Sequence, residues 1–271
     1  MILKFFRRKP PPPPPRDTAS LLKGRTAPAI LAKASDAGSS YFGGEVELPK
    51  NVPWPSKDGR PLTLLACIDL EEARMAHCVP WLPASGRLLF FYDIEQQPWG
   101  YDPKDRGSWS VIHITADTAS STATSSRAEA LARKPVGFVK IESIPSYERV
   151  HDLNLNDAET NQLFDLQEKQ YQGGRQHQLG GYPSPAQGDD MELECQLASA
   201  GVYCGNPEGY KDPRVATLKD GAKDWRLLLQ FDSDDDLGVM WGDCGKLYFW
   251  VREQDSRAGR FENVWLVLQC S

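Results

Sequence analysis

The sequence lacks the features that identify membrane proteins, disulfide-rich proteins and most metalloproteins. No stretch of its 271 residues approaches the run of roughly 20 apolar residues that a membrane-spanning helix needs. Its six cysteines contain no CxxC pair, and its four histidines form no HxH or HExxH motif. We therefore expect no stable membrane insertion, reduced thiols, no metal or other cofactor, and a cytoplasmic location.

An excess of basic residues is also missing. The chain carries 31 Lys and Arg against 37 Asp and Glu, which gives a formal net charge of −6. Proteins that bind nucleic acid directly show the opposite balance, so we do not expect a nucleic-acid surface. An acidic chain instead suits a basic protein partner.

The first 16 residues are typical of a tether. A few apolar and basic residues are followed by six consecutive prolines, which favour an extended polyproline II conformation. A secretory signal would place its charge before a longer apolar core, so no export signal is indicated. The sequence predicts a disordered basic and polyproline tether over residues 1–16 and one domain over residues 17–271, present as a monomer.

Four landmarks occur twice along the chain in the same order. Each copy has a double glycine, followed by three short leucine-rich, aromatic or β-branched runs that are typical of antiparallel strands. The matched pairs are Gly43-Gly44 with Gly180-Gly181, 64–69 with 227–232, 86–91 with 245–250, and 109–112 with 265–268. This agreement predicts an internal duplication, with repeats over about 40–114 and about 177–271 joined by a connecting segment over 115–176. We predict an α+β fold in which two mainly antiparallel β-sheet units with a few short helices pack as one body.

Several motifs inside these repeats form a distinctive set. They are Gly43-Gly44, Leu48-Pro49, Trp54-Pro55, Gly59-Arg60-Pro61-Leu62, Ile68-Asp69-Leu70, Leu82-Pro83 with Gly86, Phe90-Phe91, the run 177–181 and Trp241-Gly242-Asp243. Together they resemble the YwqG-like family over roughly residues 30–270. One departure is Cys67, which stands where the second repeat has Gln230.

The YwqG-like family is a bacterial domain family of unknown function. Its members are associated with toxin and secretion systems, including type VI secretion, so the resemblance implies an immunity protein that acts in the cytosol. The acidic charge agrees with this implication. The resemblance indicates the fold more directly than the activity.

Two motifs in the second repeat imitate reactive sites but fit them poorly. Asp232-x-Asp234-x-Asp236 is similar to a calcium loop, yet Leu237 stands where such a loop needs glycine. Cys244 and His177 could act as nucleophile and base, but no third group at a recognisable spacing would orient the base. We therefore predict that the protein is not an enzyme.

Two segments favour binding. The long loop 93–107 carries Trp99 and Tyr101, and loops of this length on a sheet frequently bind partners. The segment 186–219 is an acidic insertion that only the second repeat has, so we expect specificity there.

Our leading hypothesis is a non-enzymatic immunity protein that binds a cognate secreted antibacterial toxin, expected to be a nuclease, and occludes its active site. A nuclease attracts phosphate with basic groups, and carboxylates displayed on loops can occupy that field. The candidate partner-binding residues are Asp189, Asp190, Glu192, Glu194, Asp234, Asp235 and Asp236. The alternative is an enzyme or small-ligand-binding protein that uses a cleft between the repeats. The candidate cleft residues are Trp54, His177, Trp241 and Asp243.

Overall fold

The computed structural model describes residues 14–115 and 130–271, and the predicted tether lies outside the described residues up to residue 13. Arg16, the last residue assigned to the tether, already contacts the domain. Its backbone N–H and its guanidinium both donate hydrogen bonds to the carboxylate of Glu159. In the described part of the chain, no helix combines the length and the apolar character required to cross a membrane.

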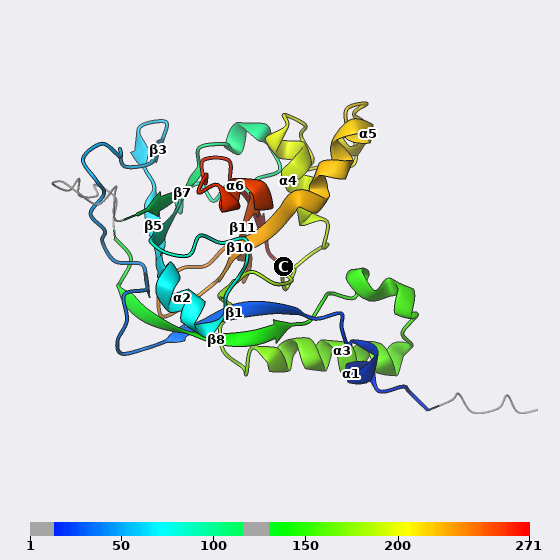
Figure 1. Ribbon diagram of the computed structural model, residues 1–271. Helices are drawn as coiled ribbons and strands as arrows, with labels where there is room; N and C mark the ends of the chain where they lie inside the picture. The colour runs from blue at the N-terminus through cyan, green and yellow to red at the C-terminus, as the bar shows by residue number, and fades with distance from the viewer. Residues whose placement is uncertain (1–13, 116–129) are drawn as a thin grey trace, which may run out of the picture.

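A ten-stranded antiparallel sheet dominates the fold (Figure 1). Its strands are β1 (Ala27–Ala34), β2 (Tyr41–Phe42), β5 (Thr63–Asp69), β6 (Arg87–Tyr92), β7 (Trp109–Ile114), β8 (Lys134–Ser143), β9 (Gln178–Leu179), β10 (Trp225–Asp232), β11 (Lys246–Arg252) and β12 (Trp265–Gln269). Their order is β12-β11-β10-β9-β1-β8-β2-β5-β6-β7. A separate small hairpin joins β3 (Ser56–Lys57) to β4 (Arg60–Pro61). Together with the helices described next, this arrangement confirms the predicted α+β class.

Helix α1 precedes the first strand, and the other helices lie in connections between strands. The α-helices are α1 (Thr18–Leu21), α2 (Leu70–Ala76), α3 (Asp157–Gln170), α4 (Met191–Ser199), α5 (Val215–Leu218) and α6 (Glu253–Arg257). The 3-10 helices are η1 (Pro103–Asp105), η2 (Glu148–Leu153), η3 (Gly209–Lys211) and η4 (Lys219–Asp224). Helix α3 runs along β1 and β8 at the bottom of Figure 1. It begins with a capping box, in which Asn156 and Glu159 each accept a hydrogen bond from the other's backbone N–H.

The strand order reads the same from either end of the sheet. The long strands β1 and β8 form the centre, the two-residue strands β2 and β9 flank them, and a three-stranded meander follows on each side. Equivalent strands also pair alike, because Tyr41 lies opposite Cys67 while Gln178 lies opposite Gln230. A register shift falls at the matching step of β5 and β10, after Leu64 and after Leu227. The landmarks seen in the sequence therefore occupy corresponding places in the sheet.

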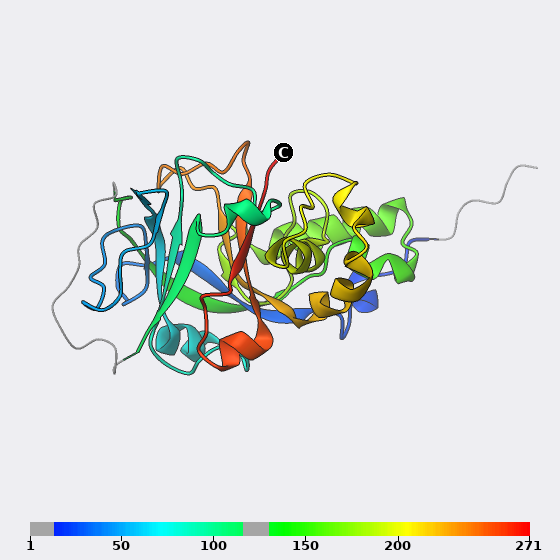
Figure 2. The same ribbon diagram turned by 90° about the horizontal axis from the view of Figure 1, so that it is seen from above.

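The sheet curls until its two ends face each other (Figure 2). Phe90 and Phe249 meet edge to face with their ring centroids 5.3 Å apart, and Trp109 meets Trp265 in the same way at 5.0 Å. Each contact joins matched positions of the two repeats. The four rings are buried, so aromatic side chains fill the space between the two halves of the sheet.

Candidate functional site

His177 lies between the rings of Phe42 and Phe231, at centroid distances of 4.6 and 4.7 Å. The backbone N–H of Asp232 donates to its Nδ1 at 3.1 Å. Since a backbone N–H can only donate, Nδ1 is unprotonated, and the ring proton sits on Nε2, 3.2 Å from the carboxylate of Asp234. This hydrogen bond lowers the pKa of Asp234. Both ring nitrogens are thus occupied, and the imidazole has no free position to act as a base.

The other cleft candidates occupy separate environments. Trp241 is buried against Tyr92 at 5.6 Å, and it shares two neighbours with His177, the ring of Phe231 and the backbone of Asp232. Trp54 belongs to a second hydrophobic cluster, in contact with the ring of Phe91, whereas Asp243 is exposed. These positions do not form one common cleft between the halves.

The acidic candidates of the insertion divide into three kinds. Asp189 has a fully buried side chain and accepts hydrogen bonds from Nε and Nη2 of Arg149. Glu192 accepts from the same Nη2 at 2.8 and 2.9 Å. Asp190 is exposed, while Glu194 is half-buried. Arg149 therefore partly neutralises two of the four carboxylates inside the fold.

Glu194 is held in an unfavourable setting for a charge. Its Oε2 is buried and has no hydrogen-bond partner among the described residues. Burial, together with the nearby charges of Asp190 and Glu192, raises the pKa of Glu194 to about 7. Near neutral pH this carboxyl group is consequently protonated in a substantial fraction of molecules.

The remaining acidic candidates belong to a hairpin over residues 232–244, which has five aspartates and no lysine or arginine. Asp234 pairs with Val239 across the hairpin and is buried, whereas Asp235 and Asp236 lie exposed at the tip. Arg175 contacts the carboxylate of Asp235 at 2.8 Å. The hairpin is therefore the most acidic exposed element that the sequence prediction named.

Hydrogen bonds join this hairpin to the loop 93–107 and join that loop to the segment 200–214. The side chain of Gln97 donates to the carbonyl of Met240 at 3.0 Å and accepts from the N–H of Gly242 at 2.9 Å. The N–H of Cys204 donates to the carbonyl of Tyr101 at 3.0 Å. We call residues 93–107, 200–214 and 232–244 together the loop surface. Figure 2 shows these loops beside the C-terminus.

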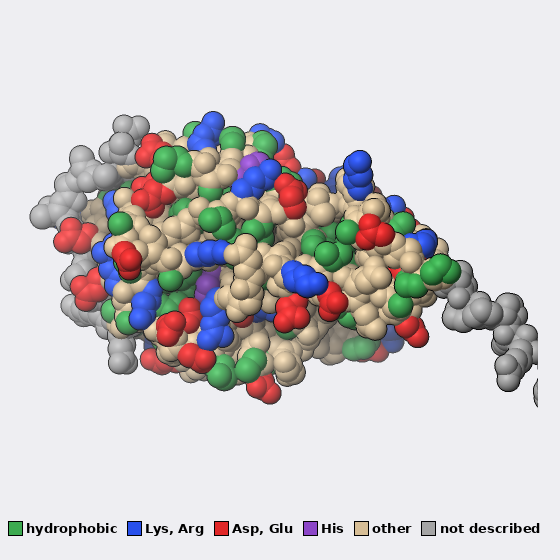
Figure 3. All heavy atoms as spheres, turned by 90° about the horizontal axis from the view of Figure 1, so that it is seen from below, with side chains coloured by type: hydrophobic (Ala, Val, Ile, Leu, Met, Phe, Trp, Pro, Cys, Tyr) green, Lys and Arg blue, Asp and Glu red, His purple; other side chains and the backbone are tan. Residues whose placement is uncertain are grey.

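Exposed apolar side chains gather on the loop surface. Among the described residues, eight large hydrophobic side chains are exposed, and half of them lie here: Trp99, Tyr203, Tyr210 and Met240. Tryptophan, tyrosine and methionine are enriched at the centres of protein interfaces. On the face in Figure 3, which is seen from below, acidic and basic side chains are interspersed instead. The sequence pointed to Trp99, but exposure of the other three follows from tertiary packing and has no sequence signal.

Comparison with known proteins assigns the chain to a family. The profile of a family described as "Domain of unknown function (DUF1963)" matches residues 40–270, so the chain belongs to this family. A search of curated proteins found no match. The matched range covers most of the residues that resemble the YwqG-like family, and that finer assignment remains a prediction.

Proposed function

We propose that this chain is a non-enzymatic immunity protein that binds a cognate antibacterial toxin through its loop surface. One observation supports the proposal above the others. Four aromatic or methionine side chains are exposed on the loop surface, whose hairpin carries five aspartates and no basic residue of its own, with Arg175 paired to Asp235. Such a surface combines apolar anchors with a negative field.

The chemistry of this surface suits a basic partner. Truncating an aromatic anchor at an interface costs about 2 kcal/mol or more, whereas exposed charges mainly accelerate the encounter of the two proteins. A toxin that cleaves nucleic acid needs a basic active site, and Asp235 and Asp236 could enter it. In this proposal the protein is a cytoplasmic monomer that inhibits a toxin, such as one delivered by type VI secretion, at one-to-one stoichiometry.

The alternative is an enzyme or ligand-binding site in a cleft between the halves. It has less support because the matched pairs Phe90–Phe249 and Trp109–Trp265 fill that space. His177, which would act as the base, already uses both ring nitrogens. A pocket elsewhere on the molecule is considered in the next subsection.

We also propose that the two halves derive from an internal duplication. Three features support this origin: the strand order is symmetric about the centre of the sheet, the register shifts match, and matched aromatic residues contact each other. Two further corresponding features are the double glycines, since Gly43, Gly44, Gly180 and Gly181 all adopt positive φ.

Co-purification from the native host, followed by a toxicity assay, tests the binding proposal. The partner should elute at near one-to-one stoichiometry, kill cells when expressed alone, and be harmless when this protein is co-expressed. The double variant Trp99→Ala and Met240→Ala should weaken binding by roughly 30-fold or more. Asp235→Asn with Asp236→Asn should mainly slow association and reduce its dependence on salt.

Phe164→Ala provides the matched control, because Phe164 is equally exposed but lies on helix α3. This variant should bind the toxin as the unmodified protein does. The proposal fails if no toxic partner is found, or if the control weakens binding as much as the loop-surface variants do.

A further inference from the structure

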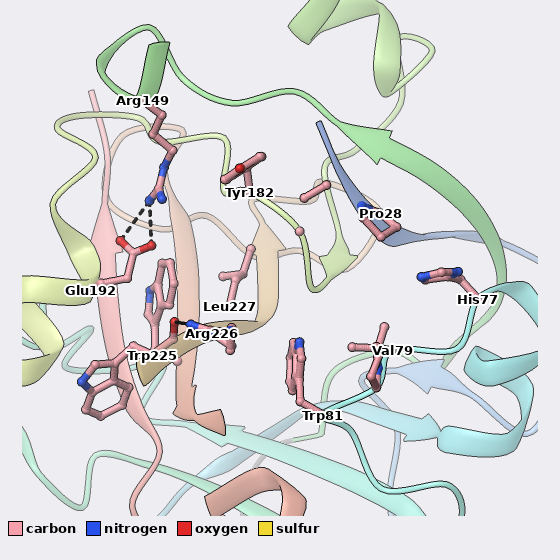
Figure 4. A pocket seen from close by; sticks show the side chains of 14 residues that line it. Pro28, His77, Val79, Trp81, Arg149, Tyr182, Glu192, Trp225, Arg226 and Leu227 are labelled. Atoms are coloured by element: carbon pink, nitrogen blue, oxygen red, sulfur yellow. Dashed lines mark hydrogen bonds and ion pairs between the residues drawn. The ribbon is translucent and has the colours of Figure 1, made fainter. Parts of the chain in front are cut away.

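A pocket of about 330 Å³ lies at the start of β10, at the opposite end of that strand from the acidic hairpin (Figure 4). This volume is at the lower end of the range for small-molecule sites. Its aromatic lining comes from four different segments and includes Trp81, Tyr182, Trp225 and Trp250. The pocket therefore has room for a ligand about the size of an amino acid, with apolar surfaces to hold its body.

The second double glycine shapes one wall of this pocket. Gly181 has a φ of +70°, and a Cβ atom there would lie 2.4 Å from the hydroxyl oxygen of Ser143. That same hydroxyl accepts a hydrogen bond from the backbone N–H of Tyr182 at 2.8 Å. A side chain at position 181 would consequently displace Tyr182 from the wall. This packing explains why position 181 is a glycine.

One end of the pocket has a residual negative charge. Arg149 faces two carboxylates. The carboxylate of Asp189 accepts one hydrogen bond from Nε of Arg149 and another from its Nη2. Ser146 donates a further hydrogen bond to Asp189. Glu192 shares only the Nη2 group; it lines the pocket together with Arg149, while Asp189 does not. Three charged groups with a net charge of −1 thus present one incompletely compensated carboxylate, drawn with Arg149 in Figure 4.

The neighbouring part of the pocket has the opposite residual charge. Arg226 lines the pocket and contacts one oxygen of Glu253 at 2.8 Å. The other oxygen of Glu253 contacts Arg257 at 2.7 Å. Two guanidinium groups therefore share one carboxylate, which leaves a net charge of +1. In Figure 4, Arg226 lies between Glu192 and Trp81.

Trp250 also lines this pocket and has a buried ring N–H without a partner among the described residues. It is only 1% exposed. Buried polar groups in native proteins are nearly always satisfied by protein, water or ligand.

We propose that this pocket binds a free α-amino acid with an apolar side chain. The ammonium group would lie at Glu192, the carboxylate would lie toward Arg226, and the side chain would pack against Trp81 and Tyr182. A zwitterion matches a pocket whose two ion-pair networks have opposite residual charges, whereas a ligand with one charge would satisfy only one of them. The pocket is separate from the loop surface, so this inference does not depend on the proposed function.

Isothermal titration calorimetry with three related probes tests the proposal on the full chain. L-phenylalanine has both charges, phenethylamine lacks the carboxylate, and 3-phenylpropanoate lacks the ammonium. L-phenylalanine should bind at one-to-one stoichiometry, and each single-charge analogue should bind about tenfold or more weakly, because each loses a charge-assisted hydrogen bond. Absence of heat with L-phenylalanine up to about 10 mM, or equal binding of all three probes, would refute the proposal.

Two variants assign the charges to the ends of the ligand. Glu192→Gln should weaken L-phenylalanine about tenfold but leave 3-phenylpropanoate unchanged, whereas Arg226→Gln should weaken L-phenylalanine but leave phenethylamine unchanged. This crossed pattern separates ligand contacts from a general loss of folding. Asp190→Asn, an exposed neighbour that does not line the pocket, is the matched control and should bind all three probes normally.

Discussion

Glu194 makes the stability of this protein depend on pH in a direction that is unusual for a carboxyl group. Burial raises its pKa from 4.5 to about 7 in the folded state, so between these two values the folded protein holds a proton that the unfolded chain releases. The free energy of unfolding should therefore fall as pH rises from about 4.5 to about 7. The difference of the two pKa values corresponds to a loss on the order of 3 kcal/mol.

The substitution Glu194→Gln removes this charge while it keeps the shape of the side chain. We expect the variant to be more stable than the unmodified protein at pH 8 by a few kcal/mol, and to match it much more closely at pH 5. Urea denaturation followed by tryptophan fluorescence at both pH values measures the effect. Glu262→Gln is the control, since Glu262 is exposed. It should leave the free energy of unfolding unchanged at both pH values. Equal effects of Glu194→Gln at pH 5 and pH 8 would refute the reasoning.

Three further predictions concern the core and the loop surface. Phe249→Ala should lower the free energy of unfolding by about 3–5 kcal/mol, measured by urea denaturation, because it empties one side of the contact between the halves; a loss below about 1 kcal/mol would contradict that packing. Gly100→Ala should destabilise the protein by about 2 kcal/mol or more in the same assay, since the φ of Gly100 is +85° and the new Cβ would clash with the carbonyl oxygen of Leu266. A neutral effect would contradict the close approach of Gly100 to Leu266. Nitrogen chemical shifts should show His177 as the neutral tautomer protonated at Nε2, and an Nδ1-protonated ring would exclude the observed bond from Asp232.

Much of the sheet could be predicted from the sequence because its strands are locally encoded. Short apolar runs bounded by glycine or aspartate indicated β5, β6, β10, β11 and β12. Their repetition indicated two sheet units, whereas the strands form one continuous ten-stranded sheet. The tryptophans of the second repeat follow strand spacing, and all four of them are buried. Helix α4 was not predicted, because its nine residues lie in an insertion that has no counterpart in the first repeat.

The exposure of charged residues could not be predicted in the same way. Asp189 looked like a displayed carboxylate, but its side chain is buried by Arg149, which is 40 positions away in the sequence. A pairing at that separation depends on how η2 and α4 pack, and no local pattern encodes it. Met240 likewise became a candidate only once the bonds from Gln97, far away in the chain, placed two loops side by side. Local patterns therefore indicate strands, whereas binding surfaces arise from contacts between distant segments.

The central strands β1 and β8 also determine whether one half of this protein could exist alone. In chain order β1 precedes the first meander, yet it pairs with β8 and with β9 of the second half, while β8 pairs with β2 of the first half. Each half therefore completes its sheet with a strand that belongs to the other. A shorter chain with only one half would expose an unpaired strand edge, and two copies could cover it only by exchanging their first strands. Under the proposed duplication, a one-half ancestor would have folded as a strand-swapped dimer, and fusion of two copies would have removed the dependence of folding on protein concentration.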